Sequence, residues 1–375
     1  MMKYLLFLLF GNFLFAQTVS TYFSDPAIRI TDAIVFDADG NLYGSDFNGD
    51  SVYKVTPDGI ATTFVSGLAN PNGLAFDSNG NLFVVEYSGA SIHKYDPTGV
   101  LLESFAVGAF PSGLIKAFNS DDMIFTLTSN SSINSLSASG AVSEIYQGAP
   151  LNTPVGLAYD DFGSLYAGNY VGREIYKVFQ GGTEFVATVP DGGNNSFLAF
   201  ITFGNGQLWG TIFFTGHKIY SINPDGVDDV TLFAGSTQGS DDGELFIAKF
   251  DSPSGLFFKN DENALYISEF TADGNVRKID NILSVGDFSS EINFTIYPNP
   301  TQNTLELSGT IQNAFEETKV SIYDYSGRLI KTVDKSLNNT NFNISMDVSE
   351  LNSGMYLIEV QLENGVSIAK TFIKI

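Results

Sequence analysis

The chain has 375 residues, of which 43% are hydrophobic and 14% aromatic, so it can form two or three domains with sizeable cores. Its 42 acidic residues outnumber 18 basic ones, and a net charge of -24 excludes most nucleic-acid partners, because an acidic surface repels phosphates. The absence of cysteine excludes disulfides and thiolate catalysis, and only two histidines exclude a three-histidine zinc site within one chain.

Residues 1–16 have the organisation of a secretory signal peptide. Lys3 supplies a positive charge, residues 5–15 form an apolar stretch too short to span a bilayer, and Ala16 precedes the polar Gln17. We therefore predict cleavage after Ala16 and passage through the periplasm. A buried N-terminal strand is the alternative for this segment. No later segment has about 18 consecutive apolar residues, so we predict no membrane span in the mature chain.

A sequence repeat dominates the middle of the chain. The pattern of residues 71–86, Pro-Asn-Gly-Leu-Ala-Phe-Asp-Ser-Asn-Gly-Asn-Leu-Phe-Val-Val-Glu, recurs with variations at spacings of 40 to 56 residues. Each unit contains short alternating apolar runs, which indicate strands, separated by turns in which glycine supplies a positive φ. A period of 40-odd residues with four strands is typical of a β-propeller blade, so six units predict six blades. The units begin at Thr31, Pro71, Pro111, Pro154, Phe197 and Pro253.

The sixth unit, residues 253–280, has only three predicted strands. The missing outer strand is predicted at the other end of the chain, because residues 19–24 resemble residues 61–66 and, like them, precede a repeat unit. Pairing of this N-terminal strand with the last blade would close the propeller and leave few exposed sheet edges. We therefore predict an all-β, six-bladed propeller over residues 17–282 that is completed by its own N-terminal strand.

Residues 234–256, between the fifth and sixth units, carry a family resemblance. The order of four features resembles the NHL repeat. They are a Gly-rich loop, Asp242-Gly243, Ala248-Lys249-Phe250 and Pro253-Ser254-Gly255-Leu256. The run Asn72-Gly73-Leu74-Ala75-Phe76 is also similar, more weakly, to gluconolactonase-like six-bladed propellers, in which an Asn at this place binds a metal.

After a polar linker at residues 283–293, residues 294–375 follow a different pattern. Alternating strands over about 80 residues predict a small Ig-like β-sandwich. Four features resemble the type A C-terminal sorting domain of the Bacteroidetes type IX secretion system. They are the Tyr-Pro-Asn-Pro opening, a Gly-Arg hairpin, a Leu-x-x-Gly-Met-Tyr strand and a Lys-flanked last strand. This resemblance implies interaction with the type IX machinery, export across the outer membrane, and then removal of the tail and release or surface attachment. An ordinary adhesive sandwich is the alternative.

The candidate ligand-binding residues lie on one face of the predicted propeller, here called the top face. It is formed by the loop before each inner strand and the loop after each second strand. Four of the six second strands end in a carboxylate or an amide, and the next residue is aromatic in five. Because neighbours on a strand point in opposite directions, we expect one set to face the axis and the other to pack between blades. The polar set is Asp46, Glu86, Asn169 and Glu269. The aromatic set is Phe47, Tyr87, Tyr170, Phe213 and Phe270.

Acids beside aromatic platforms suit a sugar, a cationic ligand or a hard metal. We therefore predict ligand binding by Asp46, Glu86, Asn169 and Glu269 together with Tyr87 and Tyr170. The alternative is that the acids only cap the loops and that the aromatic rings only fill the gaps between blades.

Asp32 and Asn72 occupy equivalent positions before two inner strands and are the candidate metal ligands. Calcium suits them best, because the available ligands are all oxygens. A calcium-dependent lactonase-like hydrolase would need several oxygens that converge on the axis, yet the equivalent positions Val155 and Leu198 are apolar. We therefore predict a secreted or cell-surface protein that binds an extracellular glycan, peptide or protein, with the hydrolase as the alternative.

Overall fold

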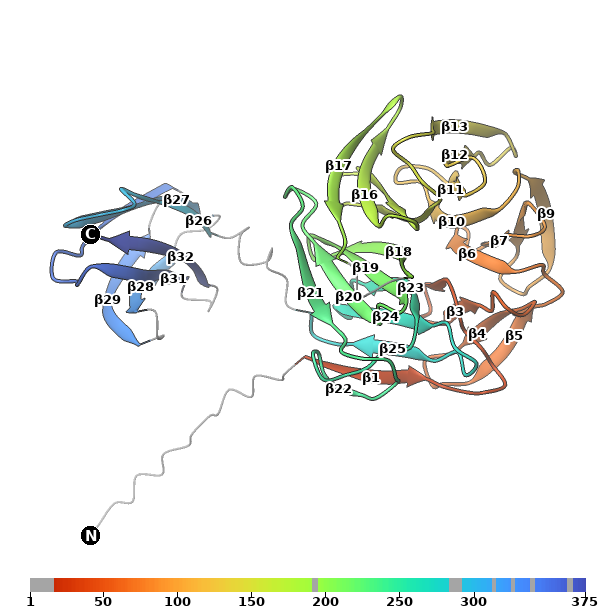
Figure 1. The fold of residues 1–375 in the computed structure, drawn as a ribbon, viewed down its shortest axis with the longest axis horizontal. Helices are drawn as coiled ribbons and strands as arrows, with labels where there is room; N and C mark the ends of the chain where they lie inside the picture. Colours follow the sequence, from red (N-terminus) through yellow and green to blue (C-terminus); the bar gives the residue numbers. More distant parts are fainter. Residues whose placement is uncertain are drawn as a thin grey trace, which may run out of the picture. The chain divides into compact units, whose positions relative to one another are not determined.

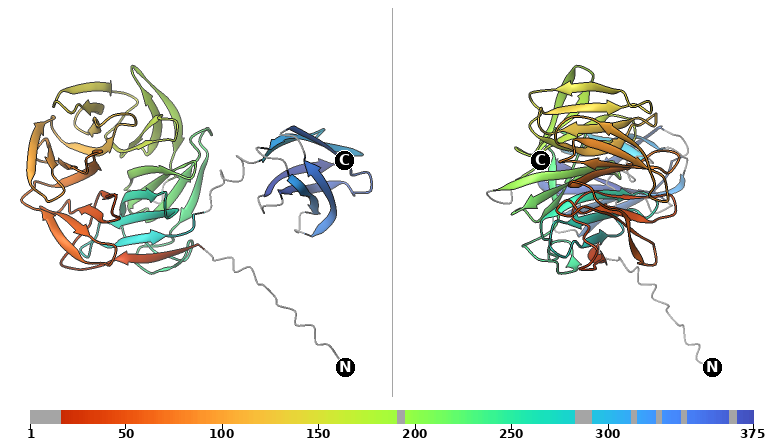
Figure 2. Two further views of the ribbon diagram at one scale, coloured as in Figure 1. Left: turned by 180° about the vertical axis from the view of Figure 1, so that it is seen from behind. Right: turned by 90° about the vertical axis from the view of Figure 1, so that its right-hand side faces the viewer.

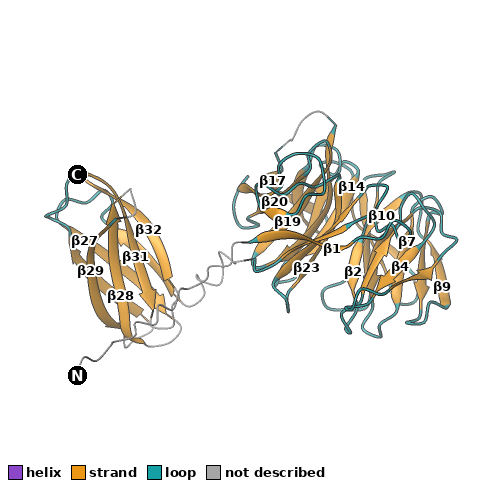
Figure 3. Ribbon diagram, turned by 90° about the horizontal axis from the view of Figure 1, so that it is seen from below, coloured by secondary structure: helices purple, strands orange, loops and turns teal. Residues whose placement is uncertain are grey.

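The structure, a computed structural model, describes residues 17–190, 195–282, 292–311, 315–324, 328–337, 341–362 and 367–375. The predicted signal peptide and most of the predicted linker lie outside these ranges. The chain divides into two compact units, Met1–Ile282 and Leu283–Ile375. Figure 3 shows that the described residues form strands and loops throughout. None of the described segments is a helix that could cross a membrane.

Six antiparallel sheets make up the described part of the first unit, and they follow one another around it as in a β-propeller (Figures 1 and 2). In the first five sheets the strands pair in sequence order, so each sheet is a meander. The strands of these five sheets are β2 (Ile34–Phe36), β3 (Leu42–Ser45), β4 (Val52–Val55) and β5 (Ala61–Val65); β6 (Pro71–Phe76), β7 (Leu82–Glu86), β8 (Ser91–Tyr95) and β9 (Leu101–Ala106); β10 (Pro111–Lys116), β11 (Met123–Leu127), β12 (Ser132–Leu136) and β13 (Val142–Gln147); β14 (Pro154–Tyr159), β15 (Leu165–Asn169), β16 (Glu174–Phe179) and β17 (Gly182–Thr188); and β18 (Ser196–Gly204), β19 (Gln207–Phe214), β20 (Lys218–Ile222) and β21 (Val230–Ala234).

The sixth sheet contains the two ends of the first unit. Its strands, in spatial order, are β22 (Gly243–Glu244), β1 (Thr18–Phe23), β25 (Val276–Ile279), β24 (Ala264–Glu269) and β23 (Pro253–Lys259). The N-terminal strand β1 lies antiparallel to β25, with Val19 opposite Ile279, which confirms the predicted closure. The short β22, which the sequence pattern did not predict, pairs with the other edge of β1. The first strand of each sheet packs beside that of the next, and β23 returns to β2, so these inner strands form a closed ring.

The recurring Pro-x-Gly-Leu sequence allows the inner strands to approach one another closely. A Cβ atom at Gly113 would lie only 1.9 Å from the carbonyl oxygen of Val155 on the next inner strand. At Gly73, the corresponding distance to the carbonyl oxygen of Ser112 would be 2.3 Å. A side chain at these positions would therefore push neighbouring sheets apart, so glycine is required for the tight ring.

Aspartate-based turns connect the first and second strands at the face opposite the top face. Asp77 accepts hydrogen bonds from the backbone N–H groups of Asn79 and Asn81, at 3.0 and 2.9 Å. Gly80 follows with φ of 79°. Asp37 and Asp160 make the same contacts in their own sheets. These carboxylates therefore stabilise turns, as expected from their sequence.

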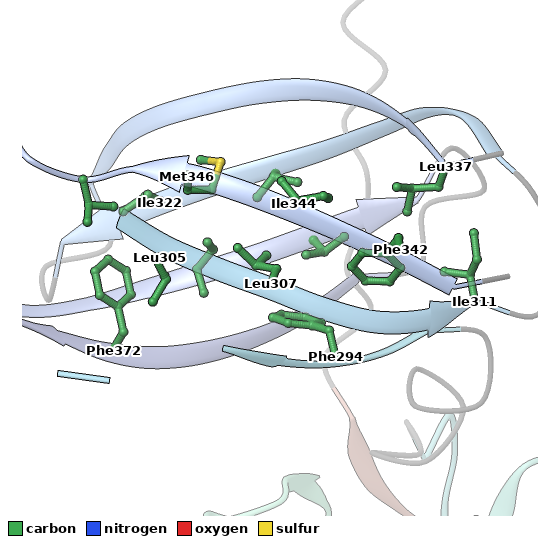
Figure 4. Packing of buried hydrophobic residues seen from close by; sticks show 14 of the residues in the cluster. Phe294, Leu305, Leu307, Ile311, Ile322, Leu337, Phe342, Ile344, Met346 and Phe372 are labelled. Atoms are coloured by element: carbon green, nitrogen blue, oxygen red, sulfur yellow. The ribbon is translucent and has the colours of Figure 1, made fainter. Parts of the chain in front are cut away.

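The second unit has two sheets that share one hydrophobic core. Buried side chains of both sheets, including Leu305, Leu307, Ile322 and Phe372, belong to a single cluster (Figure 4). In β30 (Asn341–Asp347) every second residue is buried, so one face of the strand lies against this core. The remaining strands are β26 (Ile292–Tyr297) and β27 (Thr304–Ile311), which pair with β30 in the order β26-β27-β30, and β28 (Phe315–Asp324), β29 (Leu329–Leu337), β31 (Gly354–Leu362) and β32 (Ser367–Lys374), which pair in the order β29-β28-β31-β32.

Candidate functional site: a cavity at the top face

A cavity of about 280 Å³ opens at the top face, inside the ring of inner strands. Each of the six sheets contributes to its wall, mainly through two repeat positions: the start of the inner strand and the residue after the second strand. The structure therefore brings together the two loops that the sequence places on one face. The lining residues are Asp32, Phe47, Asn72, Tyr87, Ser112, Thr128, Thr153, Val155, Tyr170, Ala199, Phe200, Phe213, Phe214, Ser254 and Phe270.

Five aromatic rings form an arc around the cavity, which we call the collar. It consists of Tyr87, Phe47, Phe270, Phe213 and Tyr170. Consecutive rings in this order are in contact, with centroids 5.4, 6.1, 5.1 and 6.2 Å apart. The third sheet has Thr128 at the equivalent position, so the arc is open there. The aromatic set is thus the one that faces the axis.

Four polar side chains at the start of consecutive inner strands form a second feature, which we call the polar arc. These are Ser254, Asp32, Asn72 and Ser112. The Ser254 hydroxyl donates a hydrogen bond of 2.6 Å to the Asp32 carboxylate. The Asn72 amide nitrogen donates to the Ser112 hydroxyl at 3.3 Å, whereas the Asn72 carbonyl oxygen, although buried, has no hydrogen-bond partner among the described residues.

The other side of the cavity is apolar. In the fourth sheet, the apolar Val155 occupies the position equivalent to the members of the polar arc, as expected from the sequence. In the fifth sheet, Ala199 lines the cavity, whereas Leu198 is fully buried in a separate core cluster. The expected equivalence of Leu198 with Asp32 is therefore wrong by one residue. Leu198 lies opposite Ile212 as Pro71 lies opposite Glu86, so Leu198 corresponds to Pro71, and the inner strand of the fifth unit is offset by one residue from the sequence alignment.

Asp32 is a buried acid of the cavity with a strongly shifted pKa. Burial raises the pKa of its carboxyl to about 7, and the hydrogen bond from Ser254 offsets only part of this effect. The pKa of Tyr170 is also raised, chiefly by burial and then by the negative charges of Asp32 and Tyr87. We call the part of the cavity at the polar arc its floor. Among the described residues, it contains one carboxyl group, and ionising this group in its buried position costs free energy.

The predicted site residues Asp46, Glu86, Asn169 and Glu269 lie behind the collar and hold loops in place. In three of them a side-chain oxygen accepts the backbone N–H of the residue 17 or 18 positions earlier, just before the inner strand. The pairs are Glu86 with Ala69 at 2.7 Å, Asn169 with Asn152 at 2.8 Å, and Glu269 with Asp251 at 2.9 Å. Asp46 differs, because it accepts from the Arg29 guanidinium at 2.8 Å and from the Thr31 hydroxyl at 3.3 Å.

The donor set around Asp32 fits a tightly bound divalent cation poorly. Among the described residues, no group of three or more His, Cys, Asp or Glu side chains could hold a metal ion. Among the described residues that line the cavity, Asp32 is the single carboxylate, beside the amide oxygen of Asn72 and the hydroxyls of Ser112 and Ser254. Because calcium affinity grows with the number of charged ligands, these residues suit a weakly held ion at most.

A second cavity, of about 390 Å³, lies at the opposite end of the ring. It is lined mainly by apolar residues of the inner strands, and Lys116 is its one basic lining residue among those described. Phe200 lines both cavities, so this residue lies between them. Neither this residue nor Phe214 belongs to a recurring polar or aromatic position, so the repeat pattern gave no signal for them.

Residues 295–374 match the family model described as the secretion system C-terminal sorting domain. No curated protein matches the chain. The type IX sorting domain expected from the sequence is therefore present in the second unit, and it indicates export to the secreted or cell-surface space.

Several solved structures resemble the chain in fold. One is an auxiliary nutrient binding protein from Bacteroides thetaiotaomicron VPI-5482, with 14% identity, a TM-score of 0.60, and coverage of 70% of this chain and 76% of that chain. Another is a gluconolactonase from Xanthomonas campestris, with 18% identity, a TM-score of 0.54, and coverage of 70% and 89%. A third is a virginiamycin B lyase from Staphylococcus aureus with quinupristin, with 18% identity, a TM-score of 0.51, and coverage of 67% and 80%. These neighbours are propeller proteins, and at such low identity the likeness concerns the fold alone.

Proposed function

We propose that this protein binds an extracellular ligand in the top-face cavity and reaches its place of action through type IX secretion. In this proposal each of the six sheets is one blade of a six-bladed, NHL-like propeller, and the second unit is an Ig-like sandwich. The proposed domains are a signal peptide at residues 1–16, the propeller at 17–282, a linker at 283–293 and the sorting domain at 294–375.

The observation that carries the binding proposal is the convergence of the collar and the polar arc on one cavity. Aromatic faces supply contact area, and polar groups at fixed positions supply orientation, which is the usual composition of a small-ligand site. The unpartnered oxygen of Asn72 supports the same conclusion, since a buried acceptor without a donor costs free energy until a ligand or water satisfies it. A glycan, or a side chain of a peptide or protein, could supply that donor.

We propose direct ligand contacts for Tyr87, Tyr170, Asp32 and Asn72, which line the cavity. For Asp46, Glu86, Asn169 and Glu269 we propose an indirect role. Their hydrogen bonds fix the ends of the second strands, from which the collar rings project, so they are positioning residues.

The sorting domain supports the export route that we propose. In this proposal the chain crosses the inner membrane by its signal peptide, passes through the periplasm and leaves through the type IX machinery. Removal of the tail then releases the propeller or leaves it attached to the cell surface. The fold likeness to an auxiliary nutrient binding protein is compatible with a binding role outside the cell.

A calcium-dependent lactonase-like hydrolase is the second candidate function. The position of Asn72 and the fold likeness to a gluconolactonase favour it, whereas the presence of just one carboxylate among the described lining residues disfavours it. Titration calorimetry with calcium chloride separates the two candidates. Micromolar binding that is lost in an Asn72→Ala variant would support the hydrolase, and the binding proposal predicts millimolar affinity or weaker.

The binding proposal is tested by screening the secreted protein on glycan and peptide arrays. We expect a hit whose affinity falls at least about tenfold in Tyr170→Leu and Asn72→Ala variants, since each removes a wall contact. Phe162→Leu is the matched aromatic control, because this ring is 91% exposed and is not among the residues that line the cavity. Hits that none of the cavity variants weaken would refute binding at this site.

A further inference from the structure

We propose that the ligand group recognised at the floor of the cavity is an alkylammonium, with its nitrogen against Asp32 and its carbon chain within the collar. This inference rests on the proposed function, because it names the chemical class of ligand for the same cavity. A lysine side chain of a peptide or protein, or a free primary amine, has this chemistry.

The charge balance of the cavity is the first argument. Two of the acids behind the collar have cationic partners: Asp46 pairs with Arg29 at 2.8 Å, and Glu269 with Arg277 at 3.2 Å. Asp32 has no such partner among the described residues, and no described Lys, Arg or His lines the cavity. Because a buried carboxylate is stabilised most by an opposite charge, the missing cation is best supplied by a ligand.

The collar is the second argument. A cation near aromatic faces is attracted by their quadrupoles, and several rings around one carboxylate form the kind of cage that binds alkylated ammonium groups. Neighbouring rings of the collar meet at interplanar angles of 50° or more, so the collar is not a flat stack. Tyr170 is additionally stacked on Phe197, with 4.5 Å between centroids, which fixes its orientation.

The hydrogen-bonding capacity of the floor is the third argument. An ammonium group has three donors and no acceptor. The floor offers the Asp32 carboxylate, the unpartnered Asn72 oxygen, and the hydroxyl oxygens of Ser112 and Ser254. A neutral sugar hydroxyl could satisfy Asn72 but would leave the carboxylate charge uncompensated, so the ammonium matches the floor better. A net charge of -24 also favours the approach of cations.

The test compares two probes of equal size, butylammonium chloride and 1-butanol, by saturation-transfer NMR on the full-length protein at pH 8. We expect butylammonium to bind at least about tenfold more tightly than 1-butanol, because only the cation gains from the carboxylate and the rings. Asp32→Asn should remove this preference, since it keeps the shape of the side chain and removes its charge. Phe47→Leu should weaken butylammonium binding through loss of one ring.

Asp160→Asn is the matched control, because Asp160 is another buried aspartate and its hydrogen bonds stabilise a turn at the opposite face. We expect it to leave butylammonium binding unchanged. Equal affinity for the two probes, or an ammonium preference that persists in Asp32→Asn, would overturn the ammonium inference.

The proposed function has a separate readout. An array ligand that requires Tyr170 and Asn72 but contains no amine would keep the cavity as a binding site and reject the ammonium. If no cavity variant changed the binding of the array ligands or of either probe, the proposed function itself would be wrong.

Discussion

The most informative single change is Asp32→Asn, because the structure predicts opposite effects on stability and on binding. In the folded protein, burial holds the pKa of Asp32 at about 7, whereas in the unfolded chain the pKa should return to its ordinary value of 3.8. Between these two values the folded state keeps a proton that the unfolded state has released. By linkage, the free energy of unfolding therefore falls as the pH rises through this window and is constant above it.

The size of the effect follows from the two pKa values. A difference of about three units corresponds to about 4 kcal/mol of lost stability once the pH is above 7, relative to strongly acidic conditions. Between pH 5 and pH 8 the loss amounts to about 2.5 kcal/mol. The amide introduced by Asp32→Asn cannot ionise, so the stability of the variant relative to the parent should rise by this amount over the same interval, whatever constant offset the amide introduces.

Thermal unfolding of both proteins at pH 5, 6, 7 and 8 measures this difference directly. For a domain of this size, 1 kcal/mol shifts the midpoint by about 2–4 °C, so the gap between variant and parent should widen by about 5–10 °C from pH 5 to pH 8. Asp160→Asn is again the control. Burial acts to raise the pKa of Asp160, but hydrogen bonds within its turn outweigh burial and lower that pKa, so Asp160 is ionised in both states from pH 5 to pH 8 and the gap between this variant and the parent should stay constant.

A gap that stays constant between pH 5 and pH 8 would show that Asp32 is ionised in the folded protein over the whole range. The carboxyl group would then have a compensating partner, and the reasoning from an uncompensated buried charge would fail. A variant that is more stable at pH 8 and has also lost butylammonium binding would instead show stability given up for function.

Further predictions concern the same unit. Butylammonium affinity of the parent should fall as the pH drops below 7, by up to about tenfold per unit, because Asp32 then takes up a proton, and a titration that is flat from pH 8 to pH 5 would contradict this. The double variant Asp46→Asn with Glu86→Gln should lower the free energy of unfolding by about 1–3 kcal/mol in denaturant titrations and weaken butylammonium binding less than Asp32→Asn does, since these acids position the collar through its loops; weaker binding without loss of stability would instead make them direct ligands. Deletion of Thr18–Phe23 removes the pairing of β1 with β25 and the buried Val19 and Phe23, so calorimetry should show a midpoint lower by about 10 °C or aggregation, and a midpoint within about 2 °C of the parent would reject the closure as a stabilising element. Mass spectrometry of the secreted protein should find Gln17 at the N-terminus and no Ile375, whereas an intact C-terminus on most molecules would count against removal of the tail.

Local signals in the sequence were sufficient for much of the architecture. Asp-x-x-Gly turns such as Asp77–Gly80 depend on contacts within five residues, and the side chain and the glycine specify them almost alone. The Pro-x-Gly-Leu repeat likewise marks places where two inner strands come close, as Gly113 shows. The pairing of Val19 with Ile279 joins residues far apart in the chain, yet it was predictable because a repeat with one strand missing has one place for a spare strand.

The candidate site was only partly predictable, because alternation along a strand says that neighbours point apart but not which of them faces the axis. Asp46 and Phe47 are adjacent in sequence, and only the twist and packing of the sheets direct the ring into the cavity and the acid behind it. The replacement of Leu198 by Ala199 at the wall depends on how β18 pairs with β19, where Leu198 lies opposite Ile212.

The sequence by itself determined the repeat, its turns, its closure and the sorting domain, because each depends on short segments that recur or match a family pattern. The tertiary structure alone decided that Asp32 is buried without a cationic partner among the described residues, and that the Asn72 oxygen is left without a donor from them. Both facts depend on side chains from separate sheets meeting around one axis. Burial and hydrogen-bond partners are properties of that assembled environment, and no local stretch of the chain contains them.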